Sequence, residues 1–222
     1  MIVLFDLATQ SDMRPSPFCW RAKLALKHKG LRFEARGIGF HDIRSLGDGS
    51  FKTLPVVRDG ERWVGGSMAA AEYFEMAYPD APALFPRDPE RLFTGFVESW
   101  VDSTVHTQMF PMVALDIWER LFDSDKDYFR RTREARLGMT LELAREYHLP
   151  KIPALRASLE PLRRVLKVRP FLAGAAPAYS DYMVFGALKW FLLASSAALL
   201  EASDPIEAWF LQIDNFAHST VD

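Results

Sequence analysis

Two serines stand immediately before predicted helices, where a side chain can help to bind an anion. Ser16 precedes Pro17 and a helical pattern over residues 17–29, and Ser67 precedes a second pattern that starts at Met68. The unpaired N–H groups and the partial positive charge of a helix N-terminus stabilise an anion such as a thiolate or a carboxylate. A serine hydroxyl there can donate one more hydrogen bond and lower the pKa of a thiol. Both serines are equally good helix caps, a role that needs no ligand.

The single cysteine, Cys19, lies three residues after Ser16. One cysteine forms no intrachain disulfide, and we expect this one to be a small buried hydrophobic residue. The alternative is a thiol that supports the ligand-binding residues or is sensitive to oxidation. The five histidines lack the spacing of metal ligands, so no metal site is predicted. They are His28, His41, His106, His148 and His218.

The composition is that of an ordinary globular protein. The 222 residues include 27 Lys and Arg against 29 Asp and Glu, a net charge of −2, and 49% are hydrophobic. These values exclude a disordered chain, and no basic stripe suggests nucleic acid. The longest apolar stretch, residues 190–200, is shorter than the roughly 20 residues of a membrane span, and residues 1–7 lack the pattern of a signal peptide. We therefore expect a soluble, cytoplasmic protein.

The elements that position the two serines alternate between strand and helix up to Pro79. The predicted order is β-α-β-α-β-β-α, with a parallel βαβ unit at the start and a hairpin turn at Asp59-Gly60. The predicted strands are residues 2–7, 32–38, 55–58 and 62–64, and the predicted helices are 17–29, 41–46 and 68–78.

Four prolines between residues 79 and 89 predict a linker, and no convincing strand follows it. We expect an α/β domain over residues 1–80, a linker over 81–89 and an all-helical domain over 90–222. Pro111 should kink the first helix. The predicted helices are 90–122, 126–148, 153–167, 181–200 and 205–216.

The element order, Leu54-Pro55, the Gly66-Ser67 helix start and the sequence FLAG at residues 171–174 together resemble the cytosolic glutathione transferases. The resemblance covers nearly the whole chain. It implies a thioredoxin-like domain followed by an all-helical domain, with glutathione as co-substrate. Residues 16–30 are more narrowly similar to the bacterial β-aryl etherases, which cleave lignin-derived ethers.

This resemblance implies a role for each residue of the site. Ser16 would hold the glutathione sulfur as a thiolate, with Ser11 and Arg14 of the same loop as alternatives. A serine at position 16 excludes dithiol redox chemistry there. Leu54 would pair through its backbone with the cysteinyl part of glutathione, beside a cis bond to Pro55.

The same comparison implies that Ser67 binds the γ-glutamyl carboxylate. Gly66 stands where the family has an acidic residue, so Glu72, Asp102 or a partner subunit would have to bind the glutathione ammonium group. Asp181 matches the acid that stabilises the start of a buried helix, whereas Ala178 replaces the usual capping residue and Ser180 is the alternative cap.

The second substrate should bind in the helical domain, where much of the aromatic side-chain mass lies. Apolar residues and one histidine share a helical face there, and we expect only two or three of them to line a pocket, the rest being core or dimer contacts. They are His106, Met109, Phe110, Val113, Ile117 and Trp118. The near-zero net charge suggests recognition of a hydrophobic aromatic substrate by apolar shape, with charge recognition left to the glutathione end.

The leading hypothesis is a homodimeric glutathione S-transferase whose thiolate attacks a hydrophobic aromatic electrophile, with β-aryl ether cleavage as one form of that reaction. Isomerisation, dehalogenation and general conjugation use the same thiolate and stay open. The alternative from another class is a glutathione-transferase-fold protein that binds ligands or partners without catalysis, which Gly66 favours. A thiol oxidoreductase is a third option, and Ser16 argues against it.

Overall fold

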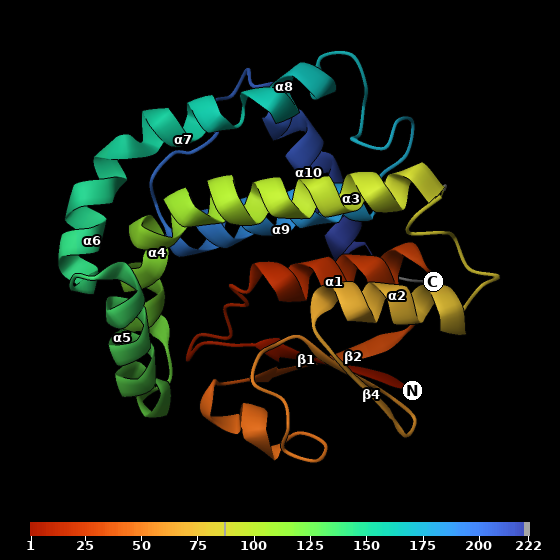
Figure 1. Ribbon diagram of the computed structural model, residues 1–222, viewed down its shortest axis with the longest axis horizontal. Coiled ribbons are helices and arrows are strands. Elements are labelled where there is room, and N and C mark those ends of the chain that lie inside the picture. The colour runs from red at the N-terminus through yellow and green to blue at the C-terminus, as the bar shows by residue number, and fades with distance from the viewer. Residues whose placement is uncertain (87, 220–222) are drawn as a thin grey trace.

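A four-stranded sheet forms one side of the computed structural model, which describes residues 1–86 and 88–219 (Figure 1). β1 runs parallel to β2 and antiparallel to β3, and β3 and β4 form a hairpin, so the strand order is β2-β1-β3-β4. This topology confirms the predicted parallel βαβ unit and the antiparallel edge. The strands are β1 (Ile2–Leu7), β2 (Phe33–Ile38), β3 (Val56–Asp59) and β4 (Arg62–Gly65).

Both faces of β1 are buried, which explains its nearly continuous apolar sequence. Successive side chains of a strand point to opposite faces of the sheet. Ile2 and Leu4 join the main core with residues of the helices that cover one face, while Val3 and Phe5 belong to a second apolar cluster. That second cluster includes Ile43 of a 3-10 helix, His41–Ser45, where the sequence predicted a short helix.

The helix α1 (Pro17–His28) begins as its sequence predicts. The Ser16 hydroxyl accepts a hydrogen bond from the Cys19 N–H at 3.3 Å, and Pro17 occupies the first turn, where its missing N–H costs nothing. Gly30, with φ +63°, follows the last turn. Ser16 is therefore the cap of α1 and stands at its positive end.

The helix α2 (Ser67–Ala77) begins one residue earlier than predicted. Gly66 occupies the cap position with φ +90°, a conformation that glycine adopts at little cost. Ser67 is thus the first helical residue, and the expectation that it caps the helix is wrong. Its N–H still lies at the open end of α2.

The single helix predicted over residues 90–122 is three segments. α3 (Asp88–Trp100) leads into a π-helical stretch, Val101–His106, and then into α4 (Thr107–Arg120). Pro111 lies inside α4, where it lacks the N–H for the helical ladder and crowds the carbonyl one turn earlier. The π-helical turn lies immediately before α4, and the helix axis changes direction there (Figure 1).

The helix predicted over residues 126–148 is two helices, α5 (Asp123–Leu137) and α6 (Leu141–His148). Gly138, with φ +70°, ends α5, and the Thr140 hydroxyl caps α6 by accepting from the Leu143 N–H. The hydrophobic periodicity runs across this break because both helices pack on the same core.

The helix predicted over residues 153–167 also divides, into α7 (Ile152–Ser158) and α8 (Glu160–Leu166). A short 3-10 turn, Leu149–Lys151, precedes them. The final helix α10 (Pro205–His218) matches its prediction closely.

The helix α9 (Tyr179–Ala194) runs through the centre of the helical part and is buried along almost its whole length. The Asp181 carboxylate, itself fully buried, accepts hydrogen bonds from the N–H groups of Leu172 and Ala178 and from the Trp209 indole. It stabilises the helix start, so the predicted folding role of Asp181 agrees with the structure. Ser180 lies inside the helix, and the suggestion that it acts as the cap is wrong.

The α/β part joins the helical part mainly through α1, which packs along α9 (Figure 1). Gly186 of α9 allows the close approach, because a Cβ atom there would lie 2.4 Å from the carbonyl oxygen of Pro17. His28 at the end of α1 bonds the hydroxyl of Tyr182 through Nδ1 at 2.7 Å. The start of α1, which carries Ser16, is therefore fixed against the helical part.

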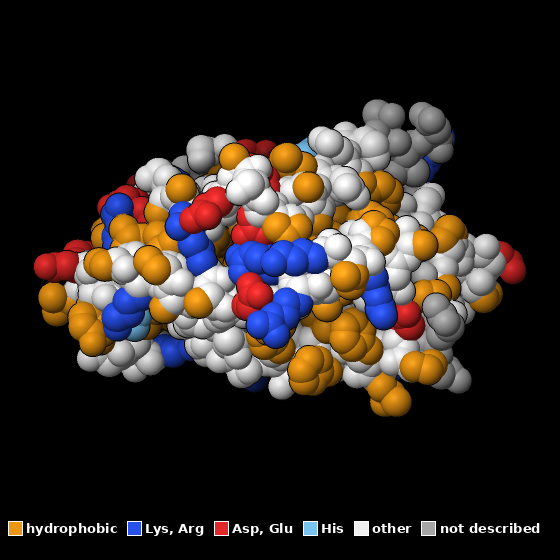
Figure 2. Space-filling view, turned by 90° about the horizontal axis from the view of Figure 1, so that it is seen from above, with side chains coloured by type: hydrophobic (Ala, Val, Ile, Leu, Met, Phe, Trp, Pro, Cys, Tyr) orange, Lys and Arg blue, Asp and Glu red, His pale blue; other side chains and the backbone are white. Residues whose placement is uncertain are grey.

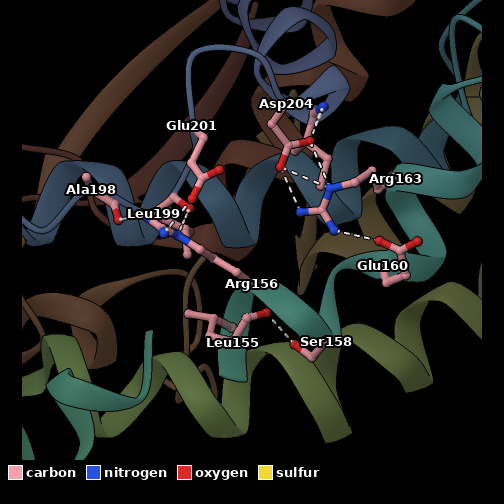
Figure 3. Close-up of polar contacts among 10 residues, drawn as sticks. Leu155, Arg156, Ser158, Glu160, Arg163, Ala198, Leu199, Glu201 and Asp204 are labelled. Atoms are coloured by element: carbon pink, nitrogen blue, oxygen red, sulfur yellow. Dashed lines mark hydrogen bonds and ion pairs between the residues drawn. The ribbon is translucent and has the colours of Figure 1, made fainter. Parts of the chain in front are cut away.

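Two arginines tie α7 and α8 to the segment before α10 (Figure 3). Arg156 donates to the Leu199 carbonyl and pairs with Glu201 at 2.7 Å, while Arg163 pairs with Asp204 at 2.7 Å. The Asp204 carboxylate in turn accepts from the Ile206 N–H in the first turn of α10. The face seen from above has acidic side chains interspersed among basic ones rather than a patch of one sign (Figure 2). Among the described helices, none is long and apolar enough to cross a bilayer.

Candidate functional site

A cavity of about 560 Å³ opens between the α/β part and the helical part. One wall comes from the loops that follow β1 and precede β3 and from the first residues of α1 and α2. The opposite wall comes from the π-helical turn, α4, α5 and α9. The first wall includes Ser16, Phe18, Lys52, Leu54, Pro55, Gly66 and Ser67.

Ser16 lines this cavity at the N-terminus of α1 and is only 7% exposed. Its oxygen accepts from the Cys19 N–H, which leaves the hydroxyl proton free to be donated elsewhere. A sulfur atom placed at this end of the cavity would meet both the hydroxyl and the positive end of α1. The arrangement can therefore stabilise a thiolate.

The two alternatives to Ser16 are held elsewhere. Ser11 is exposed, and its hydroxyl lies 3.4 Å from that of Thr9. The Arg14 guanidinium pairs with Asp12 at 2.7 Å and approaches Asp6 at 3.6 Å. Neither Ser11 nor Arg14 is among the residues that line the cavity. Of the three candidate residues, only Ser16 reaches the site.

Cys19 is completely buried and does not line the cavity. Its burial raises the pKa of the thiol well above the ordinary value, and the nearby Asp6 carboxylate raises it further. Cys19 therefore behaves as the small buried residue that was expected.

Leu54 and Pro55 line the cavity directly before β3, and the bond between them is cis, as predicted. The Gly66 N–H donates to the Pro55 carbonyl at 2.9 Å, which joins this loop to the start of α2. Within residues 1–86 and 88–219, the Leu54 N–H and C=O have no hydrogen-bond partner. They are available to pair with an extended peptide.

Gly66 and Ser67 also line the cavity, at the open end of α2. Of the two acids considered as replacements for an acid at position 66, Asp102 lines the cavity and Glu72 does not. Glu72 forms an ion pair with Arg91 of α3. Asp102 therefore remains the acid closest to the ligand-binding space.

His106 lines the cavity beside Asp102, and its Nδ1 lies 3.0 Å from an Asp102 carboxylate oxygen. Burial lowers the pKa of His106 below its ordinary 6.5. The hydrogen bond from His106 holds the pKa of Asp102 low. The neutral ring thus donates from Nδ1, and its Nε2 has no hydrogen-bond partner among the described residues. A histidine oriented in this way can accept a proton.

Some of the other residues predicted to line the pocket do so, and others are buried in the core. Phe110 and Ile117 line the cavity, together with Phe129 and Trp190. Met109 is fully buried in the core beside Val113 and does not reach the cavity. A helix exposes only part of its apolar stripe to any one neighbour, so residues at adjacent positions diverge in this way.

Trp118 is likewise absent from the cavity wall. Its indole N–H donates to the Lys126 carbonyl, and the Arg130 guanidinium stacks on its ring at 4.0 Å. Trp118 thus packs α4 against α5.

The structure adds three arginines that the sequence analysis did not select as site residues. Arg133 and Arg136 of α5 line the helical wall. This wall therefore offers positive charge as well as apolar shape to a substrate. Arg21 is fully buried behind Phe18, with carboxylate oxygens of Glu98 and Asp102 at 3.8 and 3.5 Å. Nothing in the spacing of these arginines separates them from surface arginines. Among the described residues, no cluster of three potential metal ligands is found.

Family comparisons give this geometry a context. A glutathione S-transferase C-terminal domain model matches residues 93–204, and a glutathione S-transferase N-terminal domain model matches residues 15–77. The chain belongs to the glutathione S-transferase family. The matched regions contain the start of α1 with Ser16 and most of the helical wall of the cavity.

Relatives of known sequence and structure agree with this membership. Glutathione S-transferase U22 of Arabidopsis thaliana is 27% identical over 184 residues, which are 81% of this chain and 72% of that protein. The glutathione transferase GSTFuA3 of Phanerochaete chrysosporium has the same fold with a TM-score of 0.87 at 24% identity, covering 100% of this chain and 98% of that one. CsGST63524 of Ceriporiopsis subvermispora, solved in complex with glutathione, gives 0.83 at 21% identity, with 99% and 98% covered.

The β-etherase LigF of Sphingobium sp. strain SYK-6 is a more distant structural neighbour of this chain. It superposes with a TM-score of 0.69 at 16% identity, covering 96% of this chain and 94% of LigF. At that identity the likeness concerns the fold.

Proposed function

We propose that the protein is a glutathione-dependent transferase that activates glutathione for attack on a hydrophobic aromatic electrophile. The observation that carries this proposal is the meeting of Ser16, Leu54 and Ser67 in one cavity whose other wall is aromatic. Each of the three residues offers a different kind of contact. Together these contacts suit a short peptide that carries a thiol and that has a carboxylate at one end.

The binding mode follows from these contacts. The free N–H and C=O of Leu54 would pair with the cysteinyl residue in the manner of an added strand. The γ-glutamyl carboxylate would bind the N–H and hydroxyl of Ser67 at the positive end of α2. Asp102 would take the ammonium group, and Lys52 is suitably charged for the glycyl carboxylate at the other end.

The chemistry follows from the position of Ser16. Its hydroxyl would donate to the glutathione sulfur and favour the thiolate at neutral pH. In β-aryl ether cleavage the thiolate would attack the carbon next to an aryl ketone, forming a C–S bond while the C–O bond breaks and a phenolate leaves. Proximity in the cavity and an activated nucleophile would supply the rate. The same thiolate would serve dehalogenation, isomerisation or general conjugation.

We also propose that the protein has the domain boundaries predicted from sequence. A second proposal is that it forms a homodimer. Leu92 and Phe96, one turn apart on α3, are 81% and 69% exposed, and Met76 of α2 is also exposed. The ion pair between Glu72 and Arg91 brings α2 and α3 together beside them. Exposed apolar side chains on two helices that an ion pair links favour a protein partner, and a second copy is the expectation for this family.

Gly66 is the observation that favours a non-catalytic alternative, a protein of this fold that binds without turnover. Calorimetric titration with glutathione separates the two at the first step. We expect binding at or below about millimolar concentration, followed by turnover of 1-chloro-2,4-dinitrobenzene and of a model β-aryl ether. Absence of glutathione binding would reject the transferase. Binding without turnover of any electrophile would favour the binding protein.

A further inference from the structure

Two arginines of α5 line the cavity without an acidic partner. Arg133 and Arg136 are three residues apart, so they share one helix face. No Asp or Glu of the described residues lies within ion-pair distance of either. Arg130 on the same helix contrasts with them, because it pairs with Glu134 at 2.9 Å and Glu142 at 2.8 Å.

Aromatic rings hold both guanidinium groups in place. The Arg133 Cζ lies 4.7 Å from the centre of the Phe129 ring, and the Arg136 Cζ lies 4.8 Å from that of Phe110. Stacking uses the face of a guanidinium and leaves its N–H donors free in the plane. One of these donors in Arg133 bonds the Thr132 hydroxyl at 2.8 Å. The remaining donors of this pair can present a planar fork to an anion.

The charge of the cavity wall as a whole is positive. Lys52, Arg133 and Arg136 face one acid, Asp102, which already bonds His106 and approaches Arg21. Burial lowers the pKa of Arg133, a sign that its charge is poorly compensated by its surroundings. Lys52 belongs to the same loop as Leu54, on the glutathione side. The two arginines belong to the wall that carries Phe110 and Trp190.

We propose that Arg133 and Arg136 bind a carboxylate of the second substrate, which is therefore an anionic aromatic compound. Its ring would lie against Phe110 and Trp190, and its carboxylate would accept hydrogen bonds from the guanidinium groups in a bidentate arrangement. This inference rests on the proposed transferase function, and it specifies the class of electrophile. An uncharged substrate in the cavity would leave the two arginines without an anionic partner.

The test compares two electrophiles that differ only in charge, 4-chloro-3-nitrobenzoate and 4-chloro-3-nitrobenzamide. In Arg133→Gln and Arg136→Gln, we expect kcat/KM for the benzoate to fall by about tenfold or more, since hydrogen bonds to charged groups have that strength. The value for the amide should stay within about twofold, as should the KM for glutathione. Arg133→Lys should recover part of the loss. Arg131→Gln, at an exposed position of α5 outside the cavity, is the matched control.

Equal losses for benzoate and amide would overturn the proposal. A raised KM for glutathione with both electrophiles would also overturn it, because the arginines would then hold the peptide. If the protein catalyses neither reaction, calorimetry with unreactive 4-nitrobenzoate and 4-nitrobenzamide decides the matter independently. A preference for the benzoate that disappears in Arg133→Gln supports the site even when the transferase function fails, and equal affinities reject it.

Discussion

Ser16 caps α1, and the proposed function gives the same side chain a chemical role. Its oxygen accepts from the Cys19 N–H, while its proton remains available toward the cavity. These two bonds use different parts of the hydroxyl, so capping α1 does not compete with binding a sulfur. A threonine would preserve both bonds, whereas an alanine would remove both.

We predict that Ser16→Ala lowers kcat/KM for a chloronitroaromatic by about 10- to 100-fold, the effect of raising the pKa of bound glutathione by one to two units. The direct measurement is the pH dependence of kcat/KM, whose lower inflection should move to higher pH. Ser11→Ala is the control, because Ser11 is exposed outside the cavity. An unchanged rate in Ser16→Ala would remove this residue from the mechanism while leaving the family membership intact.

At the scale of elements, short helices are held by side chains that reach the next segment. Arg163 of α8 bonds both carboxylate oxygens of Asp204, which also caps α10 (Figure 3). Arg164, its neighbour, has Glu160 as its one ion-pair partner among the described residues and is largely exposed. Adjacent arginines of the same helix therefore differ in what they connect.

We predict that Arg163→Met lowers the free energy of unfolding by about 1–3 kcal/mol, because Asp204 loses a charged partner while it stays mostly buried. Arg164→Met should leave stability within experimental error of the wild type. Urea denaturation of the two variants measures the difference. Equal effects would mean that the link between α8 and α10 contributes nothing beyond surface charge.

The contact between α1 and α9 should make stability depend on pH. His28 bonds the Tyr182 hydroxyl through Nδ1, and its Nε2–H donates to the Ala83 carbonyl at 3.1 Å. Burial lowers the pKa of His28 below 6.5 in the folded state. The unfolded chain therefore binds a proton first as the pH falls, and stability is lost below about pH 6.5.

Denaturant titrations between about pH 7.5 and 5.5 test this linkage. Wild type should lose stability across this range more steeply than His28→Gln, which cannot take up that proton. Parallel curves for the two proteins would contradict the assignment. His41→Gln, at an exposed position, is the control and should follow the wild type.

At the scale of the whole molecule, the apolar side chains on α2 and α3 stand outside the two apolar clusters that explain most of the hydrophobic content. Burying them against a second copy would remove them from water. The cavity that holds Ser16 lies between the α/β part and the helical part of one chain.

We predict that Phe96→Asp converts a dimer into a monomer, because a buried unpaired carboxylate would oppose association. Light scattering after size-exclusion chromatography measures the mass. Leu143→Asp, at an exposed apolar position on α6, should leave the mass unchanged. A wild-type monomer would reject the dimer, and a dimer in Phe96→Asp would reject this surface as its interface.

Much of the α/β part could be predicted from local sequence. The strand β1, the Ser16-Pro17 helix start and the Asp59-Gly60 turn are all favoured by nearby residues, whose backbone preferences act over a few positions. The helix breaks at Gly138 and after Trp100 were missed, because hydrophobic periodicity continues across them when both segments face one core.

The sequence by itself placed Ser16 and Ser67 at helix starts, where the N–H groups favour an anion. The resemblance to the glutathione transferases added Leu54 and Pro55 and implied a binding role for all four residues. The tertiary structure alone decided which side chains meet across the cavity. Met109 and Phe110 are adjacent in sequence, yet one is core and the other is wall. Arg130 and Arg133 share a helix, yet within residues 1–86 and 88–219 acidic partners reach Arg130 and not Arg133. Such differences depend on long-range packing, which no local pattern in the chain encodes.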